Sequence, residues 1–277
     1  MKIASTAEIS IETLNDIIAE YYDEQITIQS DTHYKRGKTY DVFEMLTIKR
    51  AIEEFLKGCP NKTRYNNVTD KDIFTYIYVK LALSVEYDDL AKDVNHANPT
   101  FKKLYAGDYL DTASGLDGAL ISKVALCSVF AETLRNLLAE KGIEAKYMSG
   151  MARPTPGVAD TPSHAWNQVK LDGVWYNCDV THDRSFIKEG LVAPNFLRSN
   201  AHFKNYTQYP ILTGASIEPA THNVSTTEQE SLMRYYRPQI RSELAPKTET
   251  KKTTQPGFFK SILTKLHIIK SSQPGDK

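Results

Sequence analysis

Two strand-like segments joined by a short turn constrain the fold of this chain more than any other feature. Residues 163–171 (SHAWNQVKL) and 174–181 (VWYNCDVT) are rich in β-branched and aromatic residues, and Asp172-Gly173 between them is a hairpin turn signal. Around such a turn, residues whose numbers sum to about 344 or 345 lie opposite each other. His164 and Asp179 sum to 343, so we expect them within one position of direct apposition.

A helix-like segment, residues 121–141, precedes the hairpin and carries Cys127 near its start. A helix N-terminus and an adjacent imidazole both lower the pKa of a thiol, and free backbone N–H groups there can stabilise an oxyanion. Cys127, His164 and Asp179 therefore lie on successive elements in the order of a nucleophile, its base and an orienting carboxylate. Cys178 faces away from Asp179 in a strand, so we assign it to the core.

Each of these residues also has an ordinary structural interpretation. A single helix cysteine is usually a small buried hydrophobe, and an Asp just before Thr181 can simply cap a turn. A metal site would use the same residues with His182 added, but catalytic zinc sites usually have closer histidine spacing, as in HExxH. We therefore predict no metal and no organic cofactor, and we expect His182 and Asp183 to be exposed loop residues.

Composition excludes several classes of protein. The 277 residues are 41% hydrophobic and formally neutral, although residues 241–277 hold eight Lys/Arg against three Asp/Glu. The body is therefore slightly acidic and is not expected to bind nucleic acid. Three cysteines without CxxC spacing argue against a disulfide framework and favour a reducing compartment. With no signal-peptide pattern and no long apolar segment, we expect a cytoplasmic protein, or one exported without a classical signal peptide.

The remaining periodic segments suggest how the chain is organised. We expect helices over 9–22, 42–57, 73–85 (capped by Asp70) and 225–244 (interrupted at Pro238), and a short strand over 26–30. The predicted organisation is a helical extension (1–40), a central domain (41–215), a C-terminal helical extension (216–245) and a flexible basic tail (246–277). Within the tail, residues 258–270 form a basic amphipathic segment, either frayed or in contact with a membrane surface or a partner.

Three stretches resemble the transglutaminase-like superfamily of cysteine enzymes. They are residues 73–88 (IFTYIYVKLALSVEYD), 127–150 (CSVFAETLRNLLAEKGIEAKYMSG) and 164–183 (HAWNQVKLDGVWYNCDVTHD). The resemblance implies an α+β fold with a papain-like core, in which the cysteine helix packs on an antiparallel sheet. It also implies that Cys127 is the nucleophile, His164 the base and Asp179 the orienting carboxylate. Many members have a glycine just before the cysteine, whereas Ala125-Leu126 precede it here.

The residues and the resemblance together predict a cysteine-dependent acyl-transfer enzyme that acts on protein or peptide amides as a peptidase, deamidase or transglutaminase. Trp166 and Asn167 are candidate substrate-binding residues, together with a loop over 105–112, although Trp166 also suits the core. The alternative is a catalytically silent module with the same fold, docked by the amphipathic segment of its tail. We expect a protein or peptide substrate in the first case.

Overall fold

A computed structural model describes residues 42–89, 115–152, 163–208 and 216–246. The chain divides into two units, Met1–Leu244 and Ala245–Lys277, and every helix and strand described belongs to the first. The helix predicted over 9–22, the strand over 26–30, the loop over 105–112 and the amphipathic segment 258–270 lie outside the described residues. The domain boundaries inferred from sequence stay predictions.

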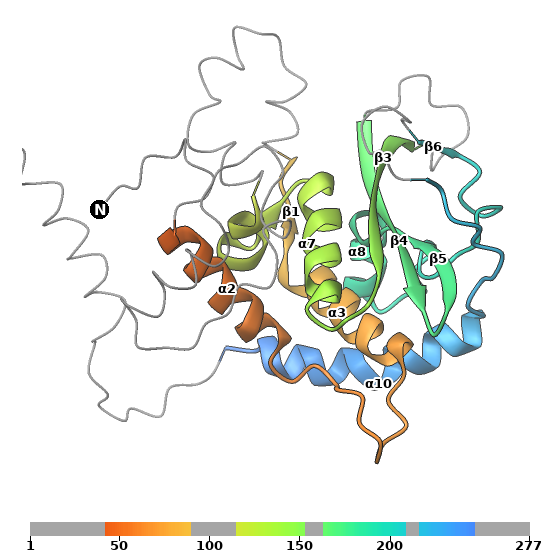
Figure 1. Ribbon diagram of the computed structural model, residues 1–277. Coiled ribbons are helices and arrows are strands. Elements are labelled where there is room, and N and C mark those ends of the chain that lie inside the picture. Colours follow the sequence, from red (N-terminus) through yellow and green to blue (C-terminus); the bar gives the residue numbers. More distant parts are fainter. Residues whose placement is uncertain (1–41, 90–114, 153–162, 209–215, 247–277) are drawn as a thin grey trace, which may run out of the picture. The chain divides into compact units, whose positions relative to one another are not determined.

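A four-stranded antiparallel sheet forms the β part of the fold, in the order β5 (Val174–Cys178), β4 (Ser163–Leu171), β3 (Ala145–Ala152) and β6 (Tyr206–Gln208) (Figure 1). In the β4–β5 hairpin Asn167 pairs with Cys178 and Gln168 with Asn177, so the register predicted from the Asp172-Gly173 turn is confirmed. Both turn residues have positive φ, 49° and 85°, as a tight type I′ turn requires.

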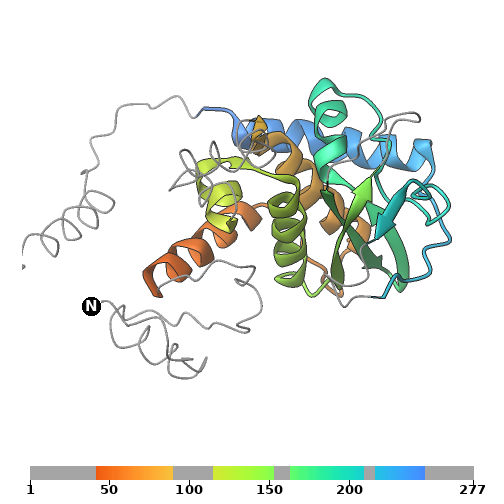
Figure 2. The same cartoon turned by 90° about the horizontal axis from the view of Figure 1, so that it is seen from above.

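Helices cover one face of this sheet (Figures 1 and 2). Helix α7 (Cys127–Ala139) packs on β3 and β4, and α3 (Asp70–Ser84) packs against α7, α8 (Val180–Glu189) and α10 (Thr226–Leu244). A further helix, α2 (Val42–Leu56), contacts the short π-helix η2 (Gly118–Ser122). The predicted α+β architecture is confirmed.

Helix α3 lies at the centre of the hydrophobic core. Its sequence is apolar on every side, and Phe74, Tyr76 and Tyr78 are fully buried, as expected of a helix without a polar face. Its N-cap is Thr69 rather than the predicted Asp70, because the Thr69 side chain accepts from the backbone N–H of Asp72, whose carboxylate accepts from the backbone N–H of Thr69. Asp70 instead pairs with Lys62 at 2.6 Å.

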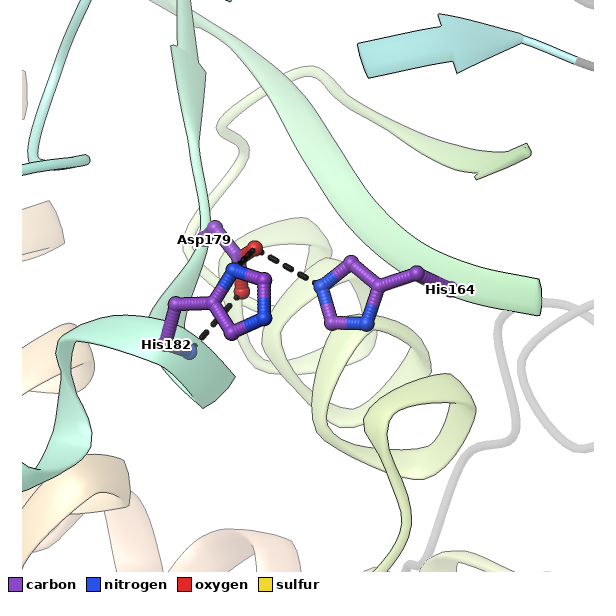
Figure 3. A group of neighbouring side chains, drawn as sticks. All are labelled: His164, Asp179 and His182. Carbon is purple, nitrogen blue, oxygen red and sulfur yellow. Dashed lines mark hydrogen bonds and ion pairs between the residues drawn. The ribbon is translucent and has the colours of Figure 1, made fainter. Parts of the chain in front are cut away.

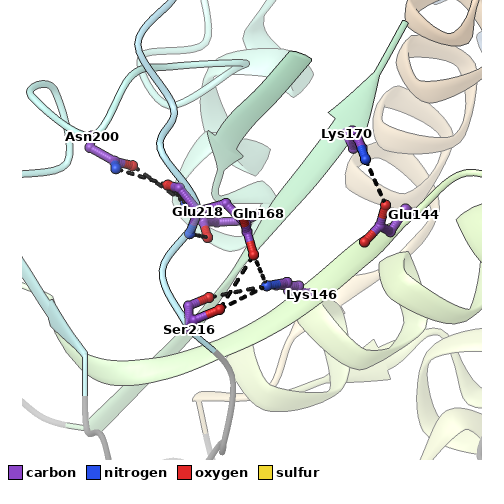
Figure 4. A network of polar contacts seen from close by, with 7 residues as sticks. All are labelled: Glu144, Lys146, Gln168, Lys170, Asn200, Ser216 and Glu218. Carbon is purple, nitrogen blue, oxygen red and sulfur yellow. Dashed lines mark hydrogen bonds and ion pairs between the residues drawn. The ribbon is translucent and has the colours of Figure 1, made fainter. Parts of the chain in front are cut away.

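The other face of the sheet carries a smaller cluster of Met148, Trp166 and Phe203, with Tyr206 packed against it. A polar network beside it fastens residues 216–218 to the sheet (Figure 4). The side-chain amide of Gln168 donates to the backbone carbonyl of Glu218 at 3.1 Å and accepts its backbone N–H at 2.8 Å. The Gln168 side chain therefore makes the two hydrogen bonds with the backbone of Glu218 that a neighbouring β-strand would otherwise make.

Three predicted elements have different boundaries in the structure. The helix expected over 121–141 begins only at Cys127, because Val124–Ala125 form a strand, β2, that pairs in parallel with β1 (Glu86–Tyr87). The strand expected to reach Thr181 ends at Cys178. Helix α10 continues through Pro238, which lies on the exposed side of the helix, so the predicted interruption is wrong. None of the helices among the described residues is long and apolar enough to cross a membrane.

Candidate active site

Cys127 is the first residue of α7, so its thiol lies at the N-terminal turn of that helix. The preceding residue, Leu126, is an N-cap without a side-chain cap, and its carbonyl accepts the backbone N–H groups of Val129 and Phe130, each at 3.0 Å. The backbone N–H groups of a first turn carry the positive end of the helix dipole. The site where α7 begins therefore favours a negative charge on the Cys127 sulfur.

His164, near the start of β4, joins Cys127 to Asp179. Its Nε2 lies 2.7 Å from Oδ2 of Asp179, and its ring is near enough to the Cys127 thiol to lower the pKa of that thiol, as does the backbone N–H of Ala165. Because Nε2 faces the carboxylate, Nδ1 is the ring nitrogen available to the sulfur. The three predicted residues therefore lie together, with the imidazole hydrogen-bonded to the carboxylate and in electrostatic contact with the thiol.

Asp179 stands between β5 and α8, where it caps the helix. Its Oδ1 accepts the backbone N–H of His182 at 3.1 Å, while Oδ2 faces His164 and, at 2.8 Å, the His182 ring (Figure 3). Oδ2 also accepts the Tyr206 hydroxyl at 2.9 Å. The residue is only 1% exposed. The predicted second strand is shorter than expected because this N-cap begins a helix at Val180.

The electrostatics of the site favour a thiolate–imidazolium pair. Burial opposes the charged form of all three groups, but their mutual contacts outweigh it. Asp179 raises the pKa of His164 to about 10. The imidazoles of His164 and His182 hold the pKa of Asp179 well below its usual range. The hydrogen bond and charge of His164, with the N–H of Ala165, lower the pKa of Cys127. At neutral pH these contacts therefore favour an ionised Asp179 and a protonated His164, and they shift Cys127 towards its thiolate.

Tyr87, on β1, is a fourth polar group at the sulfur. Its hydroxyl lies near Cys127, and burial followed by the nearby charge of Cys127 raises the pKa of Tyr87, so the hydroxyl keeps its proton. The parallel pairing of Tyr87 with Ala125 brings it there. Sequence reasoning missed this residue, because the pairing of two strands far apart in the chain leaves no local signal.

His182 and Asp183 differ from their expected positions, because both belong to the first turn of α8 rather than to an exposed loop. The His182 ring lies parallel to that of His164, with centroids 4.3 Å apart and an interplanar angle of 8°. Asp183 is fully buried and accepts the Tyr78 hydroxyl at 2.8 Å and the Asn195 backbone N–H at 2.9 Å. Asp is a favoured N-cap residue, so Asp179 is a local signal that would have identified this helical turn.

The two candidate substrate-binding residues are both buried. Trp166 is 4% exposed and packs against Tyr206, with ring centroids 5.1 Å apart. Asn167 is fully buried, and its amide donates to the carbonyl of Ala131 in α7 at 2.9 Å, so it ties the helix to the sheet. Cys178 is buried on the helix side of the sheet, and burial raises its pKa well above the ordinary value.

His164, Asp179 and His182 also offer three ligand atoms within 4.8 Å of one another, the arrangement that a metal ion would need. The nitrogen–oxygen distances of 2.7 and 2.8 Å are those of hydrogen bonds, however. Two ligands of a tetrahedral zinc ion lie roughly 3.3 Å apart when each is about 2.0 Å from the metal. The donor set therefore fits a hydrogen-bonded network better than a zinc centre.

Comparisons with known proteins point to one family. Residues 65–180 match the family model of the transglutaminase-like superfamily. One similar solved structure is a crystal structure of a TGase, with 18% identity, a TM-score of 0.39 and coverage of 53% of this chain and 34% of the other. Another is described as a candidate cysteine protease from Cytophaga hutchinsonii, with 14% identity, a TM-score of 0.34 and coverage of 64% and 55%. This chain thus spans about a third and about half of those two chains. No curated protein matches it.

Proposed function

We propose that this chain, whose residues 65–180 match the family model of the transglutaminase-like superfamily, is a cysteine-dependent enzyme that transfers acyl groups from protein or peptide amides. The observation that carries the proposal is the buried Asp179–His164 pair, which lies beside Cys127 at the start of α7 and lowers the pKa of its thiol. A purely structural cysteine has no need of an imidazole held by a carboxylate.

In the first half-reaction the Cys127 thiolate attacks the carbonyl carbon of the amide. The negative charge that develops on the carbonyl oxygen is stabilised by the backbone N–H of Cys127 and by the Tyr87 hydroxyl, which lies near the sulfur. His164 gives the proton on Nδ1 to the departing amine as the carbon–nitrogen bond breaks. The products of this step are a free amine, a neutral His164 and a thioester on Cys127.

In the second half-reaction an acceptor attacks the thioester. His164 takes a proton from that acceptor at Nδ1, the carbon–sulfur bond breaks, and the thiolate–imidazolium pair is restored. Asp179 remains ionised throughout and keeps the imidazole in the tautomer with its proton on Nε2. Water as the acceptor gives proteolysis or deamidation, and an amine gives crosslinking.

The competing proposal is a silent interaction module with the same fold. It predicts an unreactive cysteine, whereas the contacts of Cys127 favour the thiolate. Thiol labelling near neutral pH separates the two proposals, because Cys59 and Cys178 are buried in the same molecule and serve as internal references. A Cys127 that alkylates no faster than a model thiol would favour the silent module.

The chemical test compares the wild type with Cys127→Ala, and with Cys59→Ala as a matched control, in a cell extract that contains a labelled primary amine. Mass spectrometry distinguishes amine incorporation, deamidation and new peptide termini. We expect one of these products from the wild type and the Cys59→Ala variant but not from Cys127→Ala. Identical spectra for wild type and Cys127→Ala across several extracts would contradict the enzyme proposal.

A further inference from the structure

The carboxylate of Asp179 is held by more groups than the reaction above uses. Its Oδ2 lies 2.7 Å from Nε2 of His164, 2.8 Å from Nδ1 of His182 and 2.9 Å from the Tyr206 hydroxyl. Its Oδ1 accepts the backbone N–H of His182. His182 therefore supplies two of these contacts, although it takes no part in either half-reaction.

The charge on Asp179 fixes the protonation of the His182 ring. An ionised carboxylate only accepts hydrogen bonds, so the Tyr206 hydroxyl donates its proton to Oδ2. Nδ1 of His182 lies 2.8 Å from that hydroxyl oxygen and from Oδ2, so it must carry a proton and act as a donor.

The stacking of the two rings makes the charge on His182 important for His164. The parallel rings lie 4.3 Å apart (Figure 3), and a like charge at that distance disfavours the charged form of its neighbour. The His182 side chain is 30% exposed, whereas that of His164 is 9% exposed. Solvent therefore reaches the outer ring more readily than the inner one.

The surrounding groups provide little further compensation for a second cation. His164 faces His182 from β4, Asp179 from the N-cap of α8 and Tyr206 from β6. The next residue of α8, Asp183, is a buried carboxyl whose pKa is raised to about 8 by its burial, so it is mostly neutral at pH 7. Asp179 is thus the ionised carboxylate that contacts both rings, and one negative charge can balance only one imidazolium.

We propose that His182 is a positioning residue for the Cys127–His164 pair: its ring holds Asp179 and supports His164 by stacking, and a positive charge in its place weakens the pair. This proposal rests on the proposed function, because it concerns the same thiolate. It assigns no contact with substrate to His182.

Three substitutions separate the hydrogen bond of His182 from its ring and its charge. His182→Asn keeps a donor for Asp179 and removes the ring, His182→Phe keeps a flat ring and removes the donor, and His182→Arg keeps a planar donor but carries a permanent charge. His222→Asn is the matched control, because His222 is exposed and hydrogen-bonds with Thr221. The readout is the alkylation rate of Cys127 by iodoacetamide from about pH 5 to pH 9, a range that brackets the ordinary histidine and cysteine pKa values, followed on the Cys127 peptide by mass spectrometry.

We expect His182→Arg to slow alkylation about tenfold near neutral pH, because a positive charge beside His164 favours the neutral thiol and imidazole over the charged pair. His182→Phe should also slow alkylation by about tenfold, because a hydrogen bond to a charged group is lost, and His182→Asn should lose less than either. Melting temperatures measured in parallel identify loss of folding. A shift of the alkylation profile in a variant that melts like the wild type is not expected from a merely structural role.

The two proposals fail in different ways. If Cys127 in the wild type reacts no faster than a model thiol, the enzyme proposal fails and the role of His182 fails with it. If the wild type reacts quickly and both His182→Phe and His182→Arg keep its profile, only the role of His182 is overturned. A His182→Asn variant as slow as His182→Arg would also overturn it, because charge would then not matter.

Discussion

The backbone N–H of His182 donates a hydrogen bond of 3.1 Å to Oδ1 of Asp179, so the carboxylate that faces His164 is also the N-cap of α8. The two oxygens have separate tasks. Oδ1 caps the first turn of α8, while Oδ2 lies 2.7 Å from Nε2 of His164. A substitution at this position therefore acts on a helix and on an imidazole at once, and the choice of substitution can separate the two effects.

Replacing Asp179 with Asn should impair the chemistry more than the fold. Asn is as good an N-cap as Asp, whereas Ala loses the cap and costs about 1 kcal/mol more in the free energy of unfolding. Both variants lose the charge that raises the pKa of His164, so Cys127 should become reactive only at higher pH. Urea unfolding and the pH profile of alkylation measure the two effects. A wild-type alkylation profile for Asp179→Asn would show that the carboxylate does not act on the imidazole.

Replacing Tyr87 with Phe should slow turnover while leaving the thiol reactive. Removal of one donor to a developing oxyanion typically costs about 100-fold in kcat, and the Tyr87 hydroxyl is the side-chain donor that contacts Cys127 from β1. The measurement is amine incorporation or hydrolysis rate beside the alkylation rate of Cys127. Tyr65→Phe is the control, since Tyr65 is 81% exposed. Equal turnover by Tyr87→Phe and wild type would exclude this role.

The stability that His164 contributes should depend on pH in a defined direction. Its pKa is raised from 6.5 to about 10 in the folded protein, so its contribution is complete below pH 6.5 and is lost as pH rises towards 10. The difference in unfolding free energy between wild type and His164→Gln should therefore shrink over that interval. Urea titrations at three pH values across it provide the measurement. A difference that grows with pH would contradict the assigned ion pair.

Replacing the buried Asp183 with Asn should stabilise the protein at alkaline pH. Burial raises the pKa of Asp183 from 3.8 to about 8, so the folded state binds this proton more tightly and stability falls as pH rises from about 4 towards 8. An Asn side chain carries no charge, and its oxygen can still accept the Asn195 backbone N–H. We expect a higher melting temperature than wild type at pH 8 and a smaller difference at pH 5. The opposite order would show that Asp183 is ionised in the folded state.

Local sequence signals were sufficient for the hairpin and insufficient for the element before it. Asp172-Gly173 has the backbone conformation that its residue types favour, so the register of β4 and β5, and with it the proximity of His164 and Asp179, follows from residues close in the chain. The apolar pattern over 121–141 suggested a longer helix. Val124–Ala125, in the first part of that pattern, instead form a strand that pairs with Glu86–Tyr87. Such pairing between distant residues overrides local helix propensity.

The groups around Asp179 also differ in whether the local sequence predicts them. Asp179 is a favoured N-cap residue, so it could have predicted the first turn of α8 and with it the position of His182. Tyr206 reaches Asp179 from the short edge strand β6, which pairs with β3. No spacing rule connects a strand of that kind to a residue 27 positions earlier. The roles of Cys127, His164 and Asp179 in a reaction stay predictions until activity is measured.

The buried middle of helix α3, from Ile73 to Ala82, has one further consequence. Tyr78 within it contacts Asp183, and Tyr87, just beyond its end, contacts Cys127. A truncation such as Phe74→Ala would leave a cavity in this helix and cost about 3–5 kcal/mol, without removing any reactive group. Temperature-sensitive variants are therefore best sought along α3. Such variants should keep the active-site residues in place at low temperature and lose their alignment on mild warming.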